Sequence, residues 1–407
     1  MIYLDNSATT FPKPQIVRRA MNEAVSQYGA NPGRSGHNMA IRASEEMYRC
    51  RTLAAGFFGA ESPDNVVFTL NCTHAVNIVL KGLLHKGDHV VISDMEHNAV
   101  VRPLHALKER GVSYTIAKVS VGDPEETLAS FRNALRDNTK LVVCTHVSNV
   151  WGIRLPIERI TAMCHQYGIE VLVDASQSAG VLPINIGEVG IDYLCTAGHK
   201  GLYSPMGAGL LITSKGEVLH TFIEGGTGSN SAIFEQPGIM PDRFESGTQN
   251  LPAIAGLRAG IEFVTSVTPE KIHLHEIMLL DNLYDRIHDN KNVILYTPRP
   301  GIRNSGGVLS FNIKDTDSET AAEYLNTRYG IAVRAGLHCA PLAHKHFGTE
   351  EQGTVRVSPS YFTSIRDITI LSQAINSWFI TEFCGVNERT EGMERYRIRV
   401  KKKSSSR

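Results

Sequence analysis

Short runs of apolar, often β-branched residues alternate with helical stretches between about residue 40 and residue 215. Runs such as LVVCTHV and IEVLVDA are almost continuously apolar, which is typical of strands that are covered on both faces. Such strands form mainly parallel sheets, because the crossover helices between them bury both faces. We expect strands at 65–69, 89–93, 113–118, 140–146, 169–173, 193–196 and 209–213. The pattern therefore predicts an α/β fold with a mainly parallel, seven-stranded sheet.

Helix signals separate these strands. Asp123 can cap a helix that has Pro124 at its first position and Glu126 as the second half of a capping box. Pro156 opens another helix and Gly168 ends it, directly before the next strand. These segments predict βαβ crossovers.

The pattern changes after about residue 250. Amphipathic helices are expected at about 252–266 and 268–291, followed by short strands at 307–313, 331–334 and 354–358. We interpret them as part of a smaller α+β domain. The predicted division is a large α/β domain at 15–260, a small domain at 1–14 and 261–383, and a tail at 384–407. The tail is basic and expected to be disordered, with a partner-binding arm as the alternative.

Composition and charge exclude several classes of protein. The 407 residues include 41 basic and 41 acidic side chains, so nothing in the net charge indicates a nucleic-acid or membrane partner. Seven cysteines are spread along the chain without a CxxC pair, which favours neither a disulfide framework nor a metal site. No stretch reaches the length of about 18 apolar residues that a membrane span needs. We expect a cytoplasmic protein without a metal.

The densest chemical signal lies between Val171 and Pro205. A buried strand ends at Asp174, Gln177 follows in the DASQSAG turn, and Lys200 follows 26 residues after the aspartate. Because parallel strands end at one edge of a sheet, these side chains are expected to converge on one crevice. Pyridoxal phosphate needs such a set: a lysine for its aldehyde, a carboxylate for its ring nitrogen and donors for its phosphate. Each residue alone could be a helix cap or a surface side chain, but the conjunction favours the cofactor.

Matches to one family extend over nearly the whole chain. They are YLDNSATT at 3–10, NPGRSGH at 31–37, FTLNCTHAVN at 68–77, MEHNAVVRP at 95–103, HVSNVWG at 146–152, VDASQSAG at 173–180, GHKGLYSPMGAG at 198–209, FESGTQN at 244–250, RAGLHCAP at 334–341 and TVRVSPSYF at 354–362. On these motifs the sequence resembles the class V aminotransferases, which are fold type I pyridoxal-phosphate enzymes. Among them it is most similar to the cysteine desulfurase and selenocysteine lyase branch.

The resemblance implies a role for each residue around the cofactor ring. Lys200 would bind the cofactor aldehyde covalently and then act as a base. Asp174 would pair with the ring nitrogen, Gln177 would bond to the ring hydroxyl, and His97 would lie against the ring. Asn149 would support the ring oxygen or the substrate.

The resemblance also implies a phosphate site. Thr73 opens a helix whose N-terminal N–H groups can receive an anion, and His74 beside it is expected to help. His199 would contact the phosphate as well. Thr248, in the SGTQN turn, would reach the phosphate of the opposite subunit, which implies a homodimer. Related enzymes usually carry a hydroxyl residue at the position of Ala197, so this chain departs from the pattern there.

Two residues are expected to act on the substrate. Arg356 suits an α-carboxylate because a guanidinium can bind it with two parallel hydrogen bonds, and a surface arginine is the alternative. Cys339 is expected to be exposed in a loop, whereas the other six cysteines are expected to behave as small hydrophobes. In the desulfurase pattern this cysteine takes the substrate sulfur as a persulfide. Its short RAGLHCA setting resembles the group II type.

The resemblance therefore predicts a cysteine desulfurase that converts L-cysteine to L-alanine. Its catalytic residues would be Lys200, Cys339 and His97. L-Selenocysteine is expected as a second substrate, and a sulfur-acceptor protein as a partner. One alternative is another enzyme of the family, an aminotransferase, lyase or epimerase, in which Cys339 is incidental. Another is a non-catalytic dimeric scaffold, although a scaffold would need neither Lys200 nor Asp174.

Overall fold

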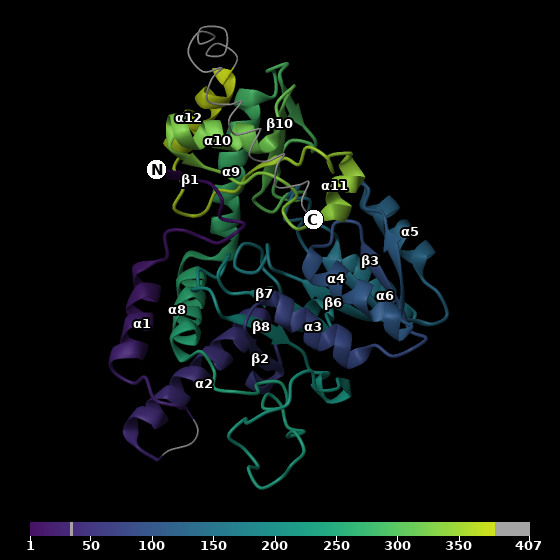
Figure 1. Cartoon of the computed structure of the whole chain (residues 1–407), viewed down its shortest axis with the longest axis vertical. Helices are drawn as coiled ribbons and strands as arrows, with labels where there is room; N and C mark the ends of the chain where they lie inside the picture. The colour runs from purple at the N-terminus through teal and green to yellow at the C-terminus, as the bar shows by residue number, and fades with distance from the viewer. Residues whose placement is uncertain (33–35, 379–407) are drawn as a thin grey trace, which may run out of the picture.

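A seven-stranded sheet organises the larger part of the molecule (Figure 1). The computed structural model describes residues 1–32 and 36–378, so the predicted tail at 384–407 lies outside the described residues. The strands are β2 (Val66–Thr69), β3 (His89–Ser93), β4 (Ser113–Ala117), β5 (Thr139–Thr145), β6 (Glu170–Asp174), β7 (Tyr193–Ala197) and β8 (Gly209–Ile212). Their order is β2-β8-β7-β6-β5-β3-β4, with β8 antiparallel to both neighbours and the other pairs parallel. The predicted α/β fold with a mainly parallel, seven-stranded sheet is confirmed.

Helices cover both faces of this sheet. On one face, α3 (Cys72–Leu83) and α4 (Asn98–Leu107) share a buried apolar core with the strands. On the other face, a second core joins the strands to α2 (Asn38–Phe58), α5 (Pro124–Ala134), α6 (Ile157–Gln166), α7 (Ile186–Val189) and α8 (Leu251–Val267). The helix α1 (Gln15–Ser26) packs on α8. Burial on both faces explains why the strand sequences are apolar throughout.

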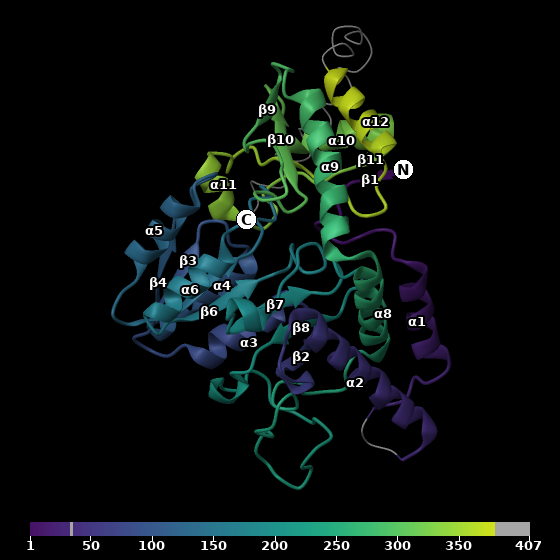
Figure 2. The same ribbon diagram turned by 180° about the vertical axis from the view of Figure 1, so that it is seen from behind.

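The remaining elements form a second layer of strands and helices, above the large sheet in Figures 1 and 2. The strand β10 (Leu309–Ile313) pairs antiparallel with β9 (Val293–Leu295) and β12 (Val355–Val357), and β1 (Ile2–Tyr3) pairs parallel with β11 (Ile331–Ala332). A third core joins them to α9 (Pro269–Ile287), α10 (Ser318–Tyr329) and α12 (Ile365–Asn376). The proposed domain boundaries, 15–260 against 1–14 with 261–383, stay a prediction.

Some local features differ from the sequence-based expectation, among them the role of Glu126 and the strand β9. Asp123 caps α5, since its carboxylate accepts from Glu126 N at 2.9 Å. Glu126 does not complete the predicted capping box, because its own carboxylate accepts from Ser120 Oγ at 2.5 Å. The strand β9 was not predicted, because its three half-buried residues give too short a pattern.

Two kinds of feature are absent from the described residues. No helix among them has the length and apolar content to cross a bilayer. They also contain no cluster of three or more histidine, cysteine, aspartate or glutamate side chains that could hold a metal ion.

Candidate active site

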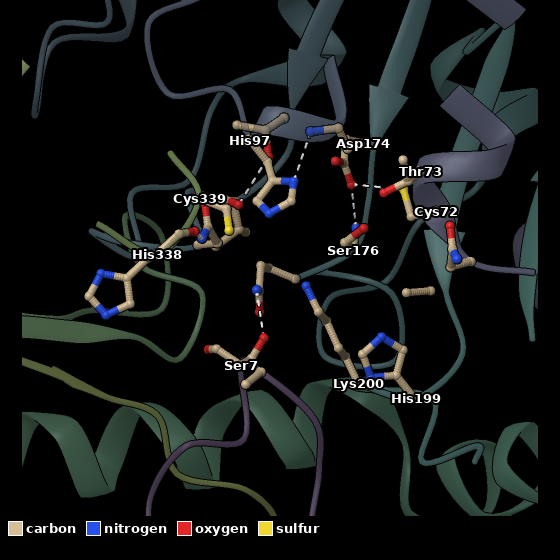
Figure 3. Close-up of a pocket in the computed structure, with 18 of the residues that line it drawn as sticks. Ser7, Cys72, Thr73, His97, Asp174, Ser176, His199, Lys200, His338 and Cys339 are labelled. Atoms are coloured by element: carbon tan, nitrogen blue, oxygen red, sulfur yellow. Dashed lines mark hydrogen bonds between the residues drawn. The ribbon is translucent and has the colours of Figure 1, made fainter. Parts of the chain in front are cut away.

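A cavity of about 230 Å³ lies at the carboxyl ends of the parallel strands, where an open α/β sheet places its ligand site. It brings together most of the predicted site residues: Thr73, His97, Asn149, Asp174, Gln177, His199, Lys200, Cys339 and Arg356. Figure 3 shows Lys200 extending into the cavity from one side. His97 and Asp174 lie opposite it, with Cys339 beside His97.

Asp174 is the last residue of β6 and is 4% exposed. Its Oδ1 accepts from Ser176 N at 2.8 Å and from Cys72 Sγ at 3.4 Å. Burial raises the pKa of the Cys72 thiol well above its ordinary value, with the Asp174 carboxylate as the next cause, so this thiol stays protonated as a donor. Two donors thus hold one oxygen of a buried carboxylate.

Lys200 follows β7 and lies across the cavity from Asp174. Burial lowers the pKa of its ammonium, while the Asp174 carboxylate acts in the opposite direction. The backbone oxygen of Lys200 accepts from Thr10 Oγ1 at 3.0 Å and from Tyr203 N at 2.9 Å. A lysine with a lowered pKa is suited to act as a nucleophile and as a base.

One corner of the cavity offers donors to an anion. The α3 helix begins there, capped by Asn71, and Cys72 and Thr73 of its first turn line the cavity. His199 lines the same cavity, and its buried Nδ1 has no hydrogen-bond partner among the described residues. Burial lowers the pKa of His199 to about 4, with Lys200 as the second cause, so the ring is neutral near pH 7.

His97 caps α4, because its Nδ1 accepts from Ala99 N at 3.0 Å. Burial lowers the pKa of this ring to about 4, and the positive charge of Lys200 is the second cause. The imidazole is therefore neutral near pH 7 and presents a flat, uncharged face to the cavity.

Two amide side chains in the cavity are bonded to backbone oxygens. Gln177 Nε2 donates to Ser7 O at 3.1 Å, and Asn149 Nδ2 donates to His338 O at 2.8 Å. Asn149 thus connects the cavity wall to the loop that carries Cys339.

Arg356, on β12, is 1% exposed, which rules out the alternative of a surface arginine. Its Nη1 donates to Asn149 O at 2.9 Å and its Nη2 to Asp5 Oδ1 at 2.8 Å. Its Nε is buried without a partner among the described residues. The guanidinium is thus fixed in the cavity wall with donors left for an anionic ligand.

Cys339 is exposed, whereas the other described cysteines, Cys50, Cys72, Cys144, Cys164 and Cys195, are buried as expected. It lies in the loop between β11 and α11 (Pro341–Phe347), two residues before the helix begins. His338 and Cys339 have φ values of 50° and 56°, a left-handed conformation that side chains with a Cβ seldom adopt. The loop therefore stores strain that its surroundings must hold.

Two predicted site residues lie outside the cavity. His74 Nδ1 accepts from Leu70 N at 3.3 Å, so its ring is turned toward its own loop. Thr248 lines a separate hollow with Asn31 and other residues of 25–32. Neither His74 nor Thr248 lines the cavity of this chain.

Among the cavity-lining residues that the sequence did not single out for this site are Ser7, Cys72 and Ser176. Each neighbours a predicted position, since Ser7 lies in the YLDNSATT motif, Cys72 precedes Thr73 and Ser176 precedes Gln177. Arg334, the first residue of the RAGLHCAP motif, lines it as well.

The cavity fits the predicted cofactor, pyridoxal phosphate. It combines a half-buried lysine, a buried carboxylate across from it, a neutral imidazole, a helix N-terminus and an unpartnered buried nitrogen. Lys200 would bind the aldehyde, Asp174 the ring nitrogen, and Thr73 and His199 the phosphate.

Comparisons with known proteins show the family of this chain. A family model described as "Aminotransferase class-V" matches residues 2–371. A probable cysteine desulfurase of Methanothermobacter thermautotrophicus is 34% identical over 92% of this chain and 94% of its own length. One from Synechocystis is 30% identical over 93% and 90% of the two chains. The apo structure of the cysteine desulfurase of Thermococcus onnurineus superposes with a TM-score of 0.85 at 29% identity, covering 92% of this chain and 94% of that one. The chain belongs to the class V aminotransferase family.

Proposed function

We propose that this protein is a pyridoxal-phosphate-dependent cysteine desulfurase. The observation that carries the proposal is the position of Cys339, an exposed thiol in the wall of the cavity that holds Lys200 and Arg356. Relatives named as cysteine desulfurases, similar over almost their whole length, support it.

The reaction would convert L-cysteine and the Cys339 thiol to L-alanine and a Cys339 persulfide. The Cβ–S bond of the substrate breaks, an S–S bond forms on Cys339, and Cβ gains a proton. The substrate carbon is reduced and the sulfur is oxidised, so no external oxidant is needed. Pyridoxal phosphate, when bound, withdraws electrons from the carbon that carries the amine.

Each residue would have a defined task. Arg356 binds the α-carboxylate, and Asn149 supports it. Lys200 moves the proton at Cα, helped by its lowered pKa. Asp174 keeps a proton on the ring nitrogen, and Gln177 and His97 orient the ring.

Three further proposals concern partners and substrates. L-Selenocysteine is accepted by the same route, because a selenolate leaves more easily than a thiolate. A sulfur-acceptor protein removes sulfur from the persulfide. The protein works as a homodimer in which Thr248 reaches the partner's phosphate site. The position of Thr248 in a separate hollow, and not in this chain's own cavity, supports that assignment.

A direct experiment separates this function from its alternatives. The holoprotein is given L-cysteine without reductant, and alanine release is measured together with the mass of the peptide that carries residue 339. We expect alanine and a gain of one sulfur on Cys339. Transamination of another amino acid without such a gain would favour a different enzyme of the family. A chain that takes up no pyridoxal phosphate would favour the scaffold.

A further inference from the structure

The segment of residues 3–10, which carries the motif YLDNSATT, has no role in the proposed reaction, yet it contacts separate parts of the active site. Ser7 N donates to Ser358 Oγ at 2.9 Å. Ser358 lies two positions after Arg356 in the sequence. Thr10 Oγ1 donates to the backbone oxygen of Lys200. This segment therefore lies between the strand that carries the arginine and the loop that carries the lysine.

Asp5, within this segment, forms an ion pair with Arg356. The distance from Arg356 Nη2 to Asp5 Oδ1 is 2.8 Å, and the two side chains are 1% and 21% exposed. Among the described residues, Asp5 is the only carboxylate that pairs with this guanidinium. A buried cation without a counter-ion is strongly unfavourable, so Asp5 stabilises the guanidinium before any ligand arrives.

The pair leaves room for one more anion. A guanidinium has five N–H donors, and Arg356 uses one for Asp5 and one for the backbone oxygen of Asn149. Arg334, which also lines the cavity, adds a second positive charge. Two guanidiniums and one carboxylate leave a single positive charge, which matches one substrate carboxylate.

A carboxylate ligand would share Arg356 with Asp5. Two carboxylates on one guanidinium repel each other, and the repulsion is stronger in a buried site than in water. Asp5 therefore has two opposed effects, since it orients the guanidinium and lowers the affinity for the carboxylate that binds there.

We propose that Asp5 is a positioning residue that also limits how tightly Arg356 holds an amino-acid carboxylate, so that the alanine product is released. This inference rests on the proposed function, because it takes Arg356 as the carboxylate-binding group. It gives a function to Asp5, a residue of the YLDNSATT motif that does not line the cavity.

The test uses Asp5→Asn in the holoprotein. The amide oxygen can still accept from Arg356 Nη2, so orientation is kept while the negative charge is removed. Binding of L-alanine, followed through the absorption spectrum of the cofactor, is expected to tighten about tenfold. Binding of L-alaninamide, which lacks the carboxylate, is expected to stay the same. A merely structural role would instead weaken both ligands.

Controls separate the possible outcomes. Asp281→Asn removes one carboxylate from the exposed Arg299 pair outside the cavity and should change neither affinity. Asp5→Ser removes the same charge with a smaller side chain and serves as the second variant if Asp5→Asn does not fold. It is then expected to tighten the binding of alanine as well. Arg356→Gln should abolish the preference for alanine over alaninamide. If Arg356→Gln abolishes this preference while both Asp5 variants bind alanine no more tightly than the parent, the inference on Asp5 is wrong and the role of Arg356 stands. If Arg356→Gln changes nothing, the carboxylate assignment fails, and the inference fails with it.

Discussion

The backbone oxygen of Cys339 accepts a hydrogen bond from Asn98 N at 2.7 Å, so the proposed nucleophile is tied to the residue that follows His97. The preceding carbonyl, of His338, is held by Asn149 Nδ2 at 2.8 Å. Both bonds fall on consecutive residues with positive φ. The strained turn is thus fixed from the cavity side by two independent donors.

Replacing Cys339 by alanine should abolish sulfur transfer from L-cysteine, with a fall of about 10³-fold or more, because no thiol remains to accept the sulfur. Cofactor uptake should stay unchanged. The measurement is alanine and sulfide release in the presence of reductant. Leu337→Ala, an exposed neighbour in the same loop, is the control and should keep parental activity. Parental desulfuration by the Cys339 variant would contradict the mechanism.

Replacing Lys200 by alanine should remove the covalent link to the cofactor and lower turnover by about 10³-fold, because the only lysine in the cavity lining of the described residues is lost. Borohydride reduction followed by peptide mass mapping checks the link. Lys215→Ala, which removes a lysine paired with Glu170 and Asp192, is the matched control and should leave the adduct on Lys200. An adduct mapped to another lysine in the parent protein would be the contrary result.

Replacing Asn149 by alanine should loosen the Cys339 loop, because the strained backbone loses one of its two holding bonds. Amide hydrogen exchange at residues 337–340 should become about tenfold faster, since the loss of one buried hydrogen bond costs about 1.4 kcal/mol. Gln177→Ala removes another cavity amide that bonds to Ser7 rather than to this loop, and it should leave that exchange unchanged. Equal exchange in all three proteins would show that Asn149 does not hold the loop.

Glu96 is expected to make the free energy of unfolding fall as the pH rises. Its side chain is fully buried, and its carboxyl accepts from Thr145 N at 2.7 Å and from Ser93 Oγ. Burial raises the pKa of Glu96 from its ordinary value of 4.5 to about 8. Because the folded state keeps the proton longer than the unfolded state, this group's contribution to stability is complete below pH 4.5 and is lost as the pH rises toward 8.

The variant Glu96→Gln should remove that dependence. Relative to it, the parent protein should lose stability from pH 4.5 to 8, by at most about 1.4 kcal/mol per pH unit. Urea unfolding at several pH values measures the difference between the two proteins. Glu188→Gln, at an exposed position, should follow the parent curve. A constant difference between the parent and the Glu96 variant would mean that Glu96 does not titrate as described.

Local sequence patterns were sufficient to predict the large sheet and the convergence of Asp174, Gln177 and Lys200, whereas the family resemblance supplied the other predicted residues of the cavity. Strands buried on both faces have a clear apolar signature, and the ends of such strands define where Asp174 and Lys200 meet. The contacts of Asn149 with His338 and of Arg356 with Asp5 could not be predicted. They join residues 189 and 351 positions apart, and no local pattern encodes such a pairing.

The direction in which a side chain points was the second feature that could not be predicted from the sequence. His74 stands next to Thr73 in the sequence, yet the α3 helix turns the two side chains differently, and only Thr73 lines the cavity. Cys72 was expected to be merely a small buried hydrophobe. It is buried, but it also donates to Asp174, because the first helical turn places its thiol toward the end of β6.

The contacts of the N-terminal segment also determine when the site is completed during synthesis. Ile2 pairs with Ile331, and Asn6 Nδ2 donates to Ser358 O, a partner 352 residues away. Contacts between residues so far apart in the chain close late in folding, because closing a long loop costs conformational entropy. Arg356 therefore meets its counter-ion, and Lys200 its complete surroundings, only after most of the chain has been made. The Asp5–Arg356 pair and the complete lining of the cavity can therefore form only after residue 358 has been made.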